Sequence, residues 1–154
     1  MYSQQQASEL RQAFWTAFGL YMAPLSSAEG EKINWLNYKT GEKNIHFKMH
    51  ADNKQAFIGI ELTHNDKDIQ QLYFEQFAEL KKVLENCLHE EWNWALHTRD
   101  ENGKTISRIY TEMNGASIFK KEDWPALISF FKPRIIALDE FWSFARHSFE
   151  TLRL

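Results

Sequence analysis

The strongest constraint on the fold is the alternation of side chains in two neighbouring segments. Apolar and polar residues alternate in residues 45–51, and after the polar turn DNKQ they alternate again in residues 56–64. Strict alternation is typical of a β-strand with one face in the core. Aligning the apolar faces predicts an antiparallel hairpin in which Phe47 lies opposite Ile60. Its register is fixed, because a slip of one residue would turn the polar face into the core.

Patterns elsewhere predict helices on both sides of this hairpin and a second hairpin after it. Spacings of three and four between apolar residues indicate helices, and Asn-Gly between alternating segments is a strong signal of a hairpin. We expect a helix over 3–22, a strand over 32–37, a helix over 67–88, a hairpin of 91–98 with 105–113, a helix capped by Asp123, and a last helix over about 134–150.

Local signals refine the second half of the chain. A two-residue loop at Asn102-Gly103 would place Leu96 opposite Ile109. Pro133 is expected to kink or break the last helical region, since the residue before a proline avoids the helical conformation. The sequence therefore predicts a single domain over residues 1–154. Its class is α+β, with the element order α-βββ-α-ββ-α and helices covering a mainly antiparallel sheet.

The composition limits the classes of protein to which the chain can belong. With 154 residues and 44% hydrophobic side chains, the fold needs neither a metal nor a disulfide, and we expect no cofactor. The formal net charge of −3 gives no global attraction to nucleic acid or anionic lipid. The single cysteine fits a reducing cytosol, the polar start is no signal peptide, and no apolar run is long enough to span a membrane. We expect a cytoplasmic protein with no membrane contact.

The polar face of the first hairpin carries the one group of side chains suited to catalysis. The register places His46 opposite Glu61, with Lys48 one diagonal step away and His50 and Thr63 nearby. A carboxylate with an imidazole and an ammonium group within reach can hold a divalent ion or act as an acid–base pair. Glu61, Lys48 and His46 are thus the candidate catalytic residues, and Glu61 is the candidate metal ligand. The alternative is a solvated sheet face with one ordinary charged pair, worth about 0.2–1 kcal/mol.

A local excess of lysine gives a second candidate site. Residues 32–54 contain five lysines and two acidic residues, and such a patch can meet phosphates, with Trp35 and Tyr38 available to stack on bases. The alternative is again a solvated face. The candidate nucleic-acid-binding residues are Lys32, Lys39, Lys43 and Lys48.

The C-terminal helix is apolar over a wide arc. A helix of this kind is either deeply buried or shared with another chain. Because full burial of a terminal helix is difficult in a small domain, we expect a homodimer through this helix. The apolar residues are Ile135, Ile136, Leu138, Phe141, Trp142, Phe144 and Phe149.

Several segments together resemble one family over residues 5–150. They are LRQAFWTAFG, KINWLNYKTG, IGIELTHND leading into LYFEQF, GKTISRIY, and SIFKKEDWPALISFFKPRIIALDEFW. The chain resembles an uncharacterised bacterial family, domain of unknown function 4268, which has no established activity. The resemblance implies a distant kinship with the restriction-endonuclease-like PD-(D/E)XK superfamily, whose core order is αβββαβ.

The kinship implies a metal site that this sequence matches only in part. In the superfamily an Asp on the second strand and a (D/E)xK motif on the third hold the metal. Glu61 matches the carboxylate of that motif, but Thr63 stands where the lysine is expected, and Asp52 falls in the turn. We therefore expect a non-catalytic interaction module of the bacterial cytoplasm that binds a protein partner, itself or nucleic acid. The alternative is a metal-dependent nuclease, or a degenerate relative of one, which would need Mg²⁺ or Mn²⁺.

Overall fold

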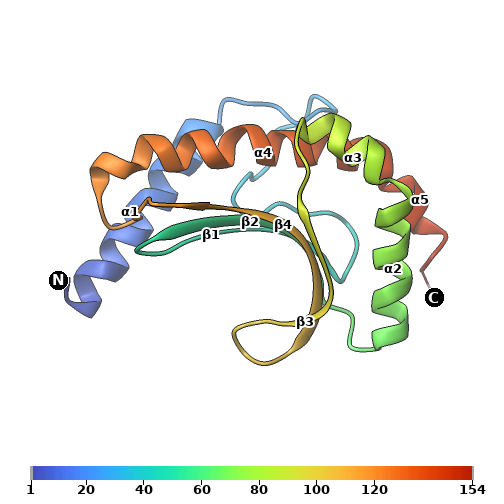
Figure 1. Cartoon of the computed structure of the whole chain (residues 1–154). Coiled ribbons are helices and arrows are strands. Elements are labelled where there is room, and N and C mark those ends of the chain that lie inside the picture. Colours follow the sequence, from blue (N-terminus) through green and yellow to red (C-terminus); the bar gives the residue numbers. More distant parts are fainter. Residues whose placement is uncertain (1, 154) are drawn as a thin grey trace.

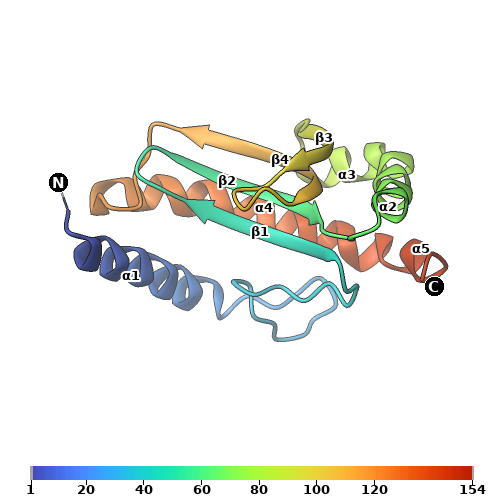
Figure 2. The same cartoon turned by 90° about the horizontal axis from the view of Figure 1, so that it is seen from below.

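One antiparallel sheet of four strands has helices packed on one of its faces (Figures 1 and 2). The computed structural model describes residues 2–153. The elements are α1 (Gln4–Met22), β1 (Ile45–Ala51), β2 (Gln55–Leu62), α2 (Lys67–Glu79), α3 (Lys81–Leu88), β3 (Asn93–Arg99), β4 (Thr105–Asn114), a 3₁₀ helix (Lys121–Asp123), α4 (Trp124–Ala145) and α5 (His147–Glu150). The strand order is β1-β2-β4-β3. The predicted α+β class is confirmed.

The first hairpin has the predicted register at every pair. Phe47 lies opposite Ile60, and His46 lies opposite Glu61. Ile58 and Ile60 on the apolar face of β2 are fully buried. This is the face that the helices cover. The alternation alone was sufficient here, since only one register places the apolar side chains of both strands on the same face.

Side chains at the helix starts explain where two of the helices begin. Ser3 and Gln6 form a capping box, in which the Gln6 N–H donates to the Ser3 hydroxyl at 3.1 Å and the Ser3 N–H donates to the Gln6 side chain at 2.9 Å. Asp66 caps α2 by accepting the N–H groups of Asp68 and Ile69 at 2.8 and 3.1 Å. Each cap satisfies N–H groups that have no partner inside the helix.

Helix α4 runs along the covered face of the sheet and lies at the centre of the core (Figure 1). Phe131, Ile135 and Phe141 on this helix are fully buried. Helix α1 packs against its first half, where the rings of Phe14 and Phe18 lie 6.3 and 5.9 Å from that of Phe131. The high aromatic content of the chain is therefore used largely in this core.

Pro133 was predicted to kink or break the last helical region, and the break is wrong, because α4 continues through the proline. A proline inside a helix costs about 3 kcal/mol, since it removes a hydrogen bond and crowds the preceding turn. Burial of a large apolar side chain is worth about 1.5–3 kcal/mol, and Phe131 and Ile135 on either side of the proline are fully buried. Pro133 itself lies on the exposed side of α4.

The strand predicted over 32–37 is a loop. The Asn34 side chain accepts the N–H groups of Leu36 and Asn37 at 3.0 and 3.1 Å, which makes a tight turn in place of an extended strand. Trp35 is buried, with its indole N–H donating to the Leu25 carbonyl at 3.0 Å. The alternation of Ile33 and Trp35 thus reflects anchoring of the loop and not strand pairing.

The helix predicted over 67–88 is two helices that meet at Leu80. The backbone at Leu80 has φ −101° and ψ 12°, which is not helical. Helix α3 packs along α4, whereas α2 turns down past the end of the curved sheet (Figure 1). Tyr73 on α2 and Leu84 on α3 are both buried. One straight helix could not place both side chains against surfaces that face in different directions.

The second hairpin is present, but its loop and register differ from the prediction. The loop is longer than Asn-Gly because the Asp100 carboxylate accepts the backbone N–H groups of Asn102 and Lys104, each at 2.9 Å. Trp94, and not Leu96, lies opposite Ile109.

Most of the apolar arc of the C-terminal region is buried within the chain itself. The loop after α1 covers part of α4: the Trp142 indole N–H donates to the Thr40 carbonyl at 2.7 Å, and the Tyr38 hydroxyl donates to Asp139 at 2.6 Å. Phe144 stays 64% exposed. The predicted homodimer remains a prediction. No helix within residues 2–153 is long and apolar enough to cross a membrane.

Gly59 in β2 allows two aromatic rings to close over the strand on the face without helices. The rings of Phe57 and Tyr110 stack with centroids 5.4 Å apart. A Cβ atom at residue 59 would lie 2.7 Å from the Cβ of Tyr110 and 3.0 Å from the Ile109 carbonyl oxygen. Both are fixed by the neighbouring strand, so only glycine fits at this position.

We expect Gly59→Ala to lower the free energy of unfolding by about 1–3 kcal/mol, the usual cost of overpacking. Gly19→Ala in α1 is the matched control. Its new methyl group would meet only the flexible end of Leu36 at 3.0 Å, and the helix gains about 1 kcal/mol of propensity. Urea denaturation of both variants measures the difference. Equal effects at the two positions would contradict this account.

Candidate functional site

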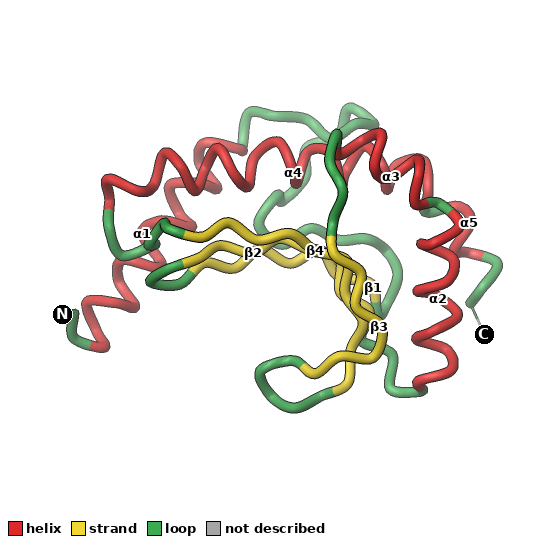
Figure 3. Tube along the Cα trace, in the orientation of Figure 1, coloured by secondary structure: helices red, strands yellow, loops and turns green. Residues whose placement is uncertain are grey.

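The face of the sheet away from α4 is concave and contains a cavity of about 270 Å³. Seen from below, β1, β2 and β4 lie in front of α4 (Figure 2), and the loop between β3 and β4 curls beneath them (Figure 3). We call this cavity the trough. It is lined by Lys48, His50, Gln55, Phe57, Glu61, Glu101, Arg108 and Glu112.

A bulge in β3 bends the second hairpin so that it forms one wall of the trough. The register shifts between Ala95 and Thr98, and His97 has a φ of 49°, in the left-handed region. The His97 N–H donates to the Ser107 hydroxyl at 3.0 Å in place of a ladder bond. Bulges bend and twist the strand that contains them.

A buried polar network fixes this bend against α2. The Ser107 hydroxyl donates to the Gln70 side chain at 2.6 Å, and Gln70 in turn donates to the carbonyls of His64 and Thr105 at 2.9 and 3.2 Å. Gln70 and Ser107 are both fully buried. Because unsatisfied buried groups are costly, this network holds the hairpin in one orientation.

Glu61 lies at the base of the trough between two cations. Its carboxylate is 3.1 Å from Nη2 of Arg108 and 3.9 Å from Nζ of Lys48. The Arg108 guanidinium also lies over the Phe57 ring, 5.4 Å from its centroid. His46, although directly opposite Glu61 in register, has its ring near the Thr63 hydroxyl at 3.2 Å. The structure thus brings Glu61 and Lys48 together but does not bring His46 to them.

The alternative of a solvated sheet face is wrong for Glu61, which is only 7% exposed. The prediction paired the two strands of the first hairpin only and gave β2 no second neighbour. In the structure β4 pairs with β2 and places Arg108 directly opposite Glu61, where it shields the carboxylate.

An ion pair joins the hairpin loop to the far strand of the sheet. Nζ of Lys48 on β1 lies 3.3 Å from a carboxylate oxygen of Glu101 in the loop between β3 and β4. The Glu101 backbone N–H and the Lys48 ammonium group lower the pKa of Glu101. Both side chains are accessible to water, so this pair is weak and sensitive to salt.

The two carboxylates considered for the predicted metal site, Glu61 and Asp52, are engaged in other contacts. A nuclease metal ion requires at least two oxygen ligands in a fixed arrangement. No group of three or more His, Cys, Asp or Glu side chains within residues 2–153 is arranged to hold a metal. Glu61 is instead paired with cations, and Asp52 accepts the N–H groups of Lys54 and Gln55 in the turn, each at 2.9 Å.

The four candidate lysines do not form one patch. Lys32 and Lys39 line a hollow beside α4, Lys43 lines a second hollow, and Lys48 lines the trough. Both hollows also contain acidic side chains. Trp35 is 3% exposed, so the expectation that it is available for base stacking is wrong. Its ring anchors the loop instead.

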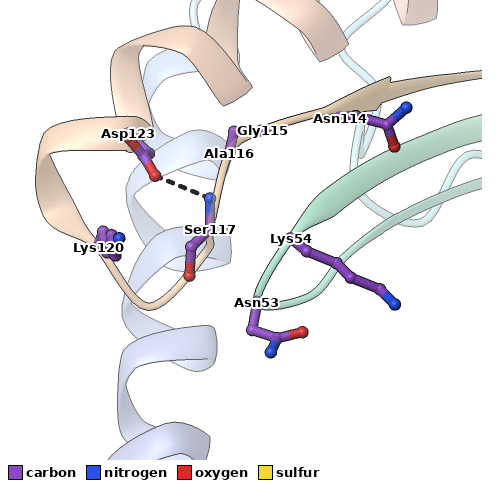
Figure 4. A pocket seen from close by; sticks show the side chains of 8 residues that line it. All are labelled: Asn53, Lys54, Asn114, Gly115, Ala116, Ser117, Lys120 and Asp123. Atoms are coloured by element: carbon purple, nitrogen blue, oxygen red, sulfur yellow. Dashed lines mark hydrogen bonds between the residues drawn. The ribbon is translucent and has the colours of Figure 1, made fainter. Parts of the chain in front are cut away.

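A further hollow of about 430 Å³ lies at the opposite end of the hairpin (Figure 4). Lys54 extends away from Ser117 and Asp123 in this view. The Asp123 carboxylate accepts the Ser117 N–H at 2.9 Å, which fixes the chain before α4. The polar side chains here do not converge on a common point, and the hollow is not a candidate site.

Sequence reasoning missed the residues that give the trough its shape. Phe57 lies among polar positions on β2, two residues before Gly59, and an aromatic residue close to a strand glycine is the signal that could have found it. Glu101 and Arg108 gave no such signal. The place of Glu101 depends on the bend of the second hairpin, and that of Arg108 depends on the pairing of β4 with β2.

We expect Glu61→Ala to lower the free energy of unfolding by about 1–3 kcal/mol, because Arg108 loses its partner in a shielded place. Glu101→Ala, which removes an exposed partner of Lys48, is the control and should change stability by less than about 0.5 kcal/mol. Urea titrations of both variants provide the measurement. A Glu61→Ala protein as stable as wild type would show that the carboxylate has no structural role.

The comparisons with known proteins point to one family. Searches of curated proteins and of solved structures found no match. Residues 10–145 match a family described as Domain of unknown function (DUF4268). This match covers all four strands and ends with the last residue of α4. The chain therefore belongs to the family of that domain of unknown function.

Proposed function

We propose that this protein is a non-catalytic binding module of the bacterial cytoplasm, and that its trough receives a segment of a protein partner. The observation that carries the proposal is the concave sheet face, where the half-buried rings of Phe57 and Tyr110 lie beside Arg108 under an arched hairpin. Aromatic and arginine side chains are enriched where proteins bind one another.

The charges of the trough support binding over catalysis. A general acid or base must be free to exchange a proton with a substrate. Here Glu61 is enclosed between Arg108 and Lys48, and Lys48 is shared with Glu101. Two of the three predicted catalytic residues, Glu61 and Lys48, are thus held in ion pairs. The third, His46, lies beside Thr63 and not beside them.

The balance of charge favours a protein partner over nucleic acid. The trough contains two permanent cations, Lys48 and Arg108, and three glutamates. Nucleic-acid sites need a surplus of cations to neutralise phosphates. A cavity of about 270 Å³ is of the size that receives anchoring side chains from a partner.

Self-association is a separate part of this proposal. Of the apolar side chains on the C-terminal helix, Phe144 stays 64% exposed, and a homodimer would cover it. Light scattering at micromolar concentration tests this: we expect twice the mass of one chain, with Phe144→Ser shifting the equilibrium to monomer. The mass of a single chain for wild type would overturn the homodimer and leave the trough proposal intact.

A displayed library of random peptides tests the trough. We expect peptides selected on wild type to bind Phe57→Ala and Glu112→Lys at least about tenfold more weakly, which is about 1.4 kcal/mol. Leu20→Ser, on an exposed part of α1, is the control and should bind them unchanged. Thermal unfolding establishes that each variant is folded, and Glu112→Lys changes an exposed side chain that makes no packing contribution to the core.

Two results would contradict the proposal. Peptides that bind both trough variants as tightly as wild type would show that the binding surface lies elsewhere. Tight binding of a labelled single-stranded oligonucleotide, lost in Phe57→Ala, would assign the same surface to nucleic acid instead of protein.

A further inference from the structure

A second hollow, of about 450 Å³, lies where the loop before β1, the chain after β2 and the end of the described chain meet. We call it the Glu42 hollow. The side chains that matter in it are Glu42, His64, Tyr73 and Arg153. None of them lines the trough.

The Glu42 carboxylate is buried, and the backbone that carries it is fixed. Its side chain is only 6% exposed. The Glu42 N–H donates to the Thr40 hydroxyl at 3.1 Å, and its carbonyl accepts the Thr40 hydroxyl at 3.1 Å and the Ile45 N–H at 3.3 Å. These bonds fix the backbone at Glu42, from which the side chain extends. A buried carboxylate of this kind requires a cation or several hydrogen-bond donors.

The cation that meets this need is Arg153. Its Nε donates to Oε2 of Glu42 at 2.8 Å, and its Nη2 also donates to the same oxygen. The Arg153 side chain is 58% exposed. The pair is thus asymmetric: the carboxylate is enclosed by the fold, while the guanidinium group reaches it from the solvent side and can exchange with another guanidinium group.

Two further side chains, His64 and Tyr73, line the hollow beside the ion pair. His64 is 8% exposed, and its Nδ1 has no hydrogen-bond partner within residues 2–153. Its ring lies 4.2 Å from that of Tyr73. Burial lowers the pKa of His64, so its imidazole is neutral at pH 7, and burial and Glu42 raise the pKa of Tyr73, which stays a phenol. Arg153 leaves Nδ1 of His64 unpaired, so it is a hydrogen-bonding group that a ligand in the hollow can still engage.

We propose that the Glu42 hollow is a binding site for the guanidinium group of an arginine side chain, which Arg153 occupies in this structure. The planar guanidinium group carries donors in a fixed fork, and this matches a single buried carboxylate with a neutral imidazole and a phenol nearby. A lysine ammonium group has neither the fork nor the flat face that stacks on rings. The ligand is an arginine supplied by another protein segment or by the free amino acid.

The test uses the full chain with Arg153→Ala and the probe Nα-acetyl-arginine amide. Binding is followed by titration calorimetry and by the NMR signals of the His64 ring. We expect the probe to bind Arg153→Ala at least about tenfold more tightly than wild type, because the internal competitor is gone. The double variant Arg153→Ala/Glu42→Gln should lose this binding, and the corresponding lysine amide should bind at least about tenfold more weakly.

Arg146→Ala is the matched control. Arg146 also pairs with a glutamate, Glu29, at 2.9 Å, but that pair is exposed on both sides. Removing its guanidinium group should not increase binding of the probe. Free L-arginine and an arginine-containing peptide, compared at equal concentration, distinguish the two sources of the ligand.

The outcomes that would overturn the proposal are distinct from a failure to fold. Circular dichroism shows whether Arg153→Ala is folded. If folded Arg153→Ala does not bind the probe, the hollow contains no guanidinium site. The same conclusion follows if it binds the probe with no change in the His64 signals. Equal binding by the arginine and lysine amides would reduce the site to a simple charge pair and would equally refute it.

Discussion

Helix α4 must bury apolar side chains around most of its circumference, and the other elements are arranged to allow this. The sheet covers one side, α1 covers the first half, and α3 packs along another side. The loop between α1 and β1 covers what remains through Tyr38 and Thr40. Because each layer contacts the same helix, the hydrophobic free energy of the domain is concentrated there. The opposite face of the sheet is left without a helix, and this is why a trough can exist.

The sequence was sufficient wherever the determining interactions are local. The register of the first hairpin follows from its own alternation, and the start of α1 follows from Ser3. Prediction failed where distant parts of the chain decide the local conformation. Pro133 remains in a helix because α4 is held on both sides of it by the core. Trp35 is anchored in a loop because its indole N–H donates to the Leu25 carbonyl and its ring packs in the hydrophobic core.

The candidate site shows the same division. That Lys48 and Glu61 would be neighbours could be predicted from pairing of the strands alone. The shielding of Glu61 could not be predicted in this way. It comes from Arg108, which lies 47 positions later in the chain on β4, and from a hairpin bent by its bulge. The bend depends on the buried contact of Ser107 with Gln70, which joins residues far apart in sequence. No periodicity within either segment encodes such a contact.

The bulge in β3 also bears on aggregation, in which the edge of one sheet pairs with an extended segment of another chain. β3 is one of the two outer strands of the sheet, and an outer strand offers unpaired N–H and C=O groups to any extended chain nearby. The interruption at residues 96–97 divides it into two short pieces, and the bend turns the second piece beneath the sheet. An incoming strand therefore finds no long straight edge along β3. The irregularity that shapes the trough thus also protects this edge of the sheet against edge-to-edge aggregation.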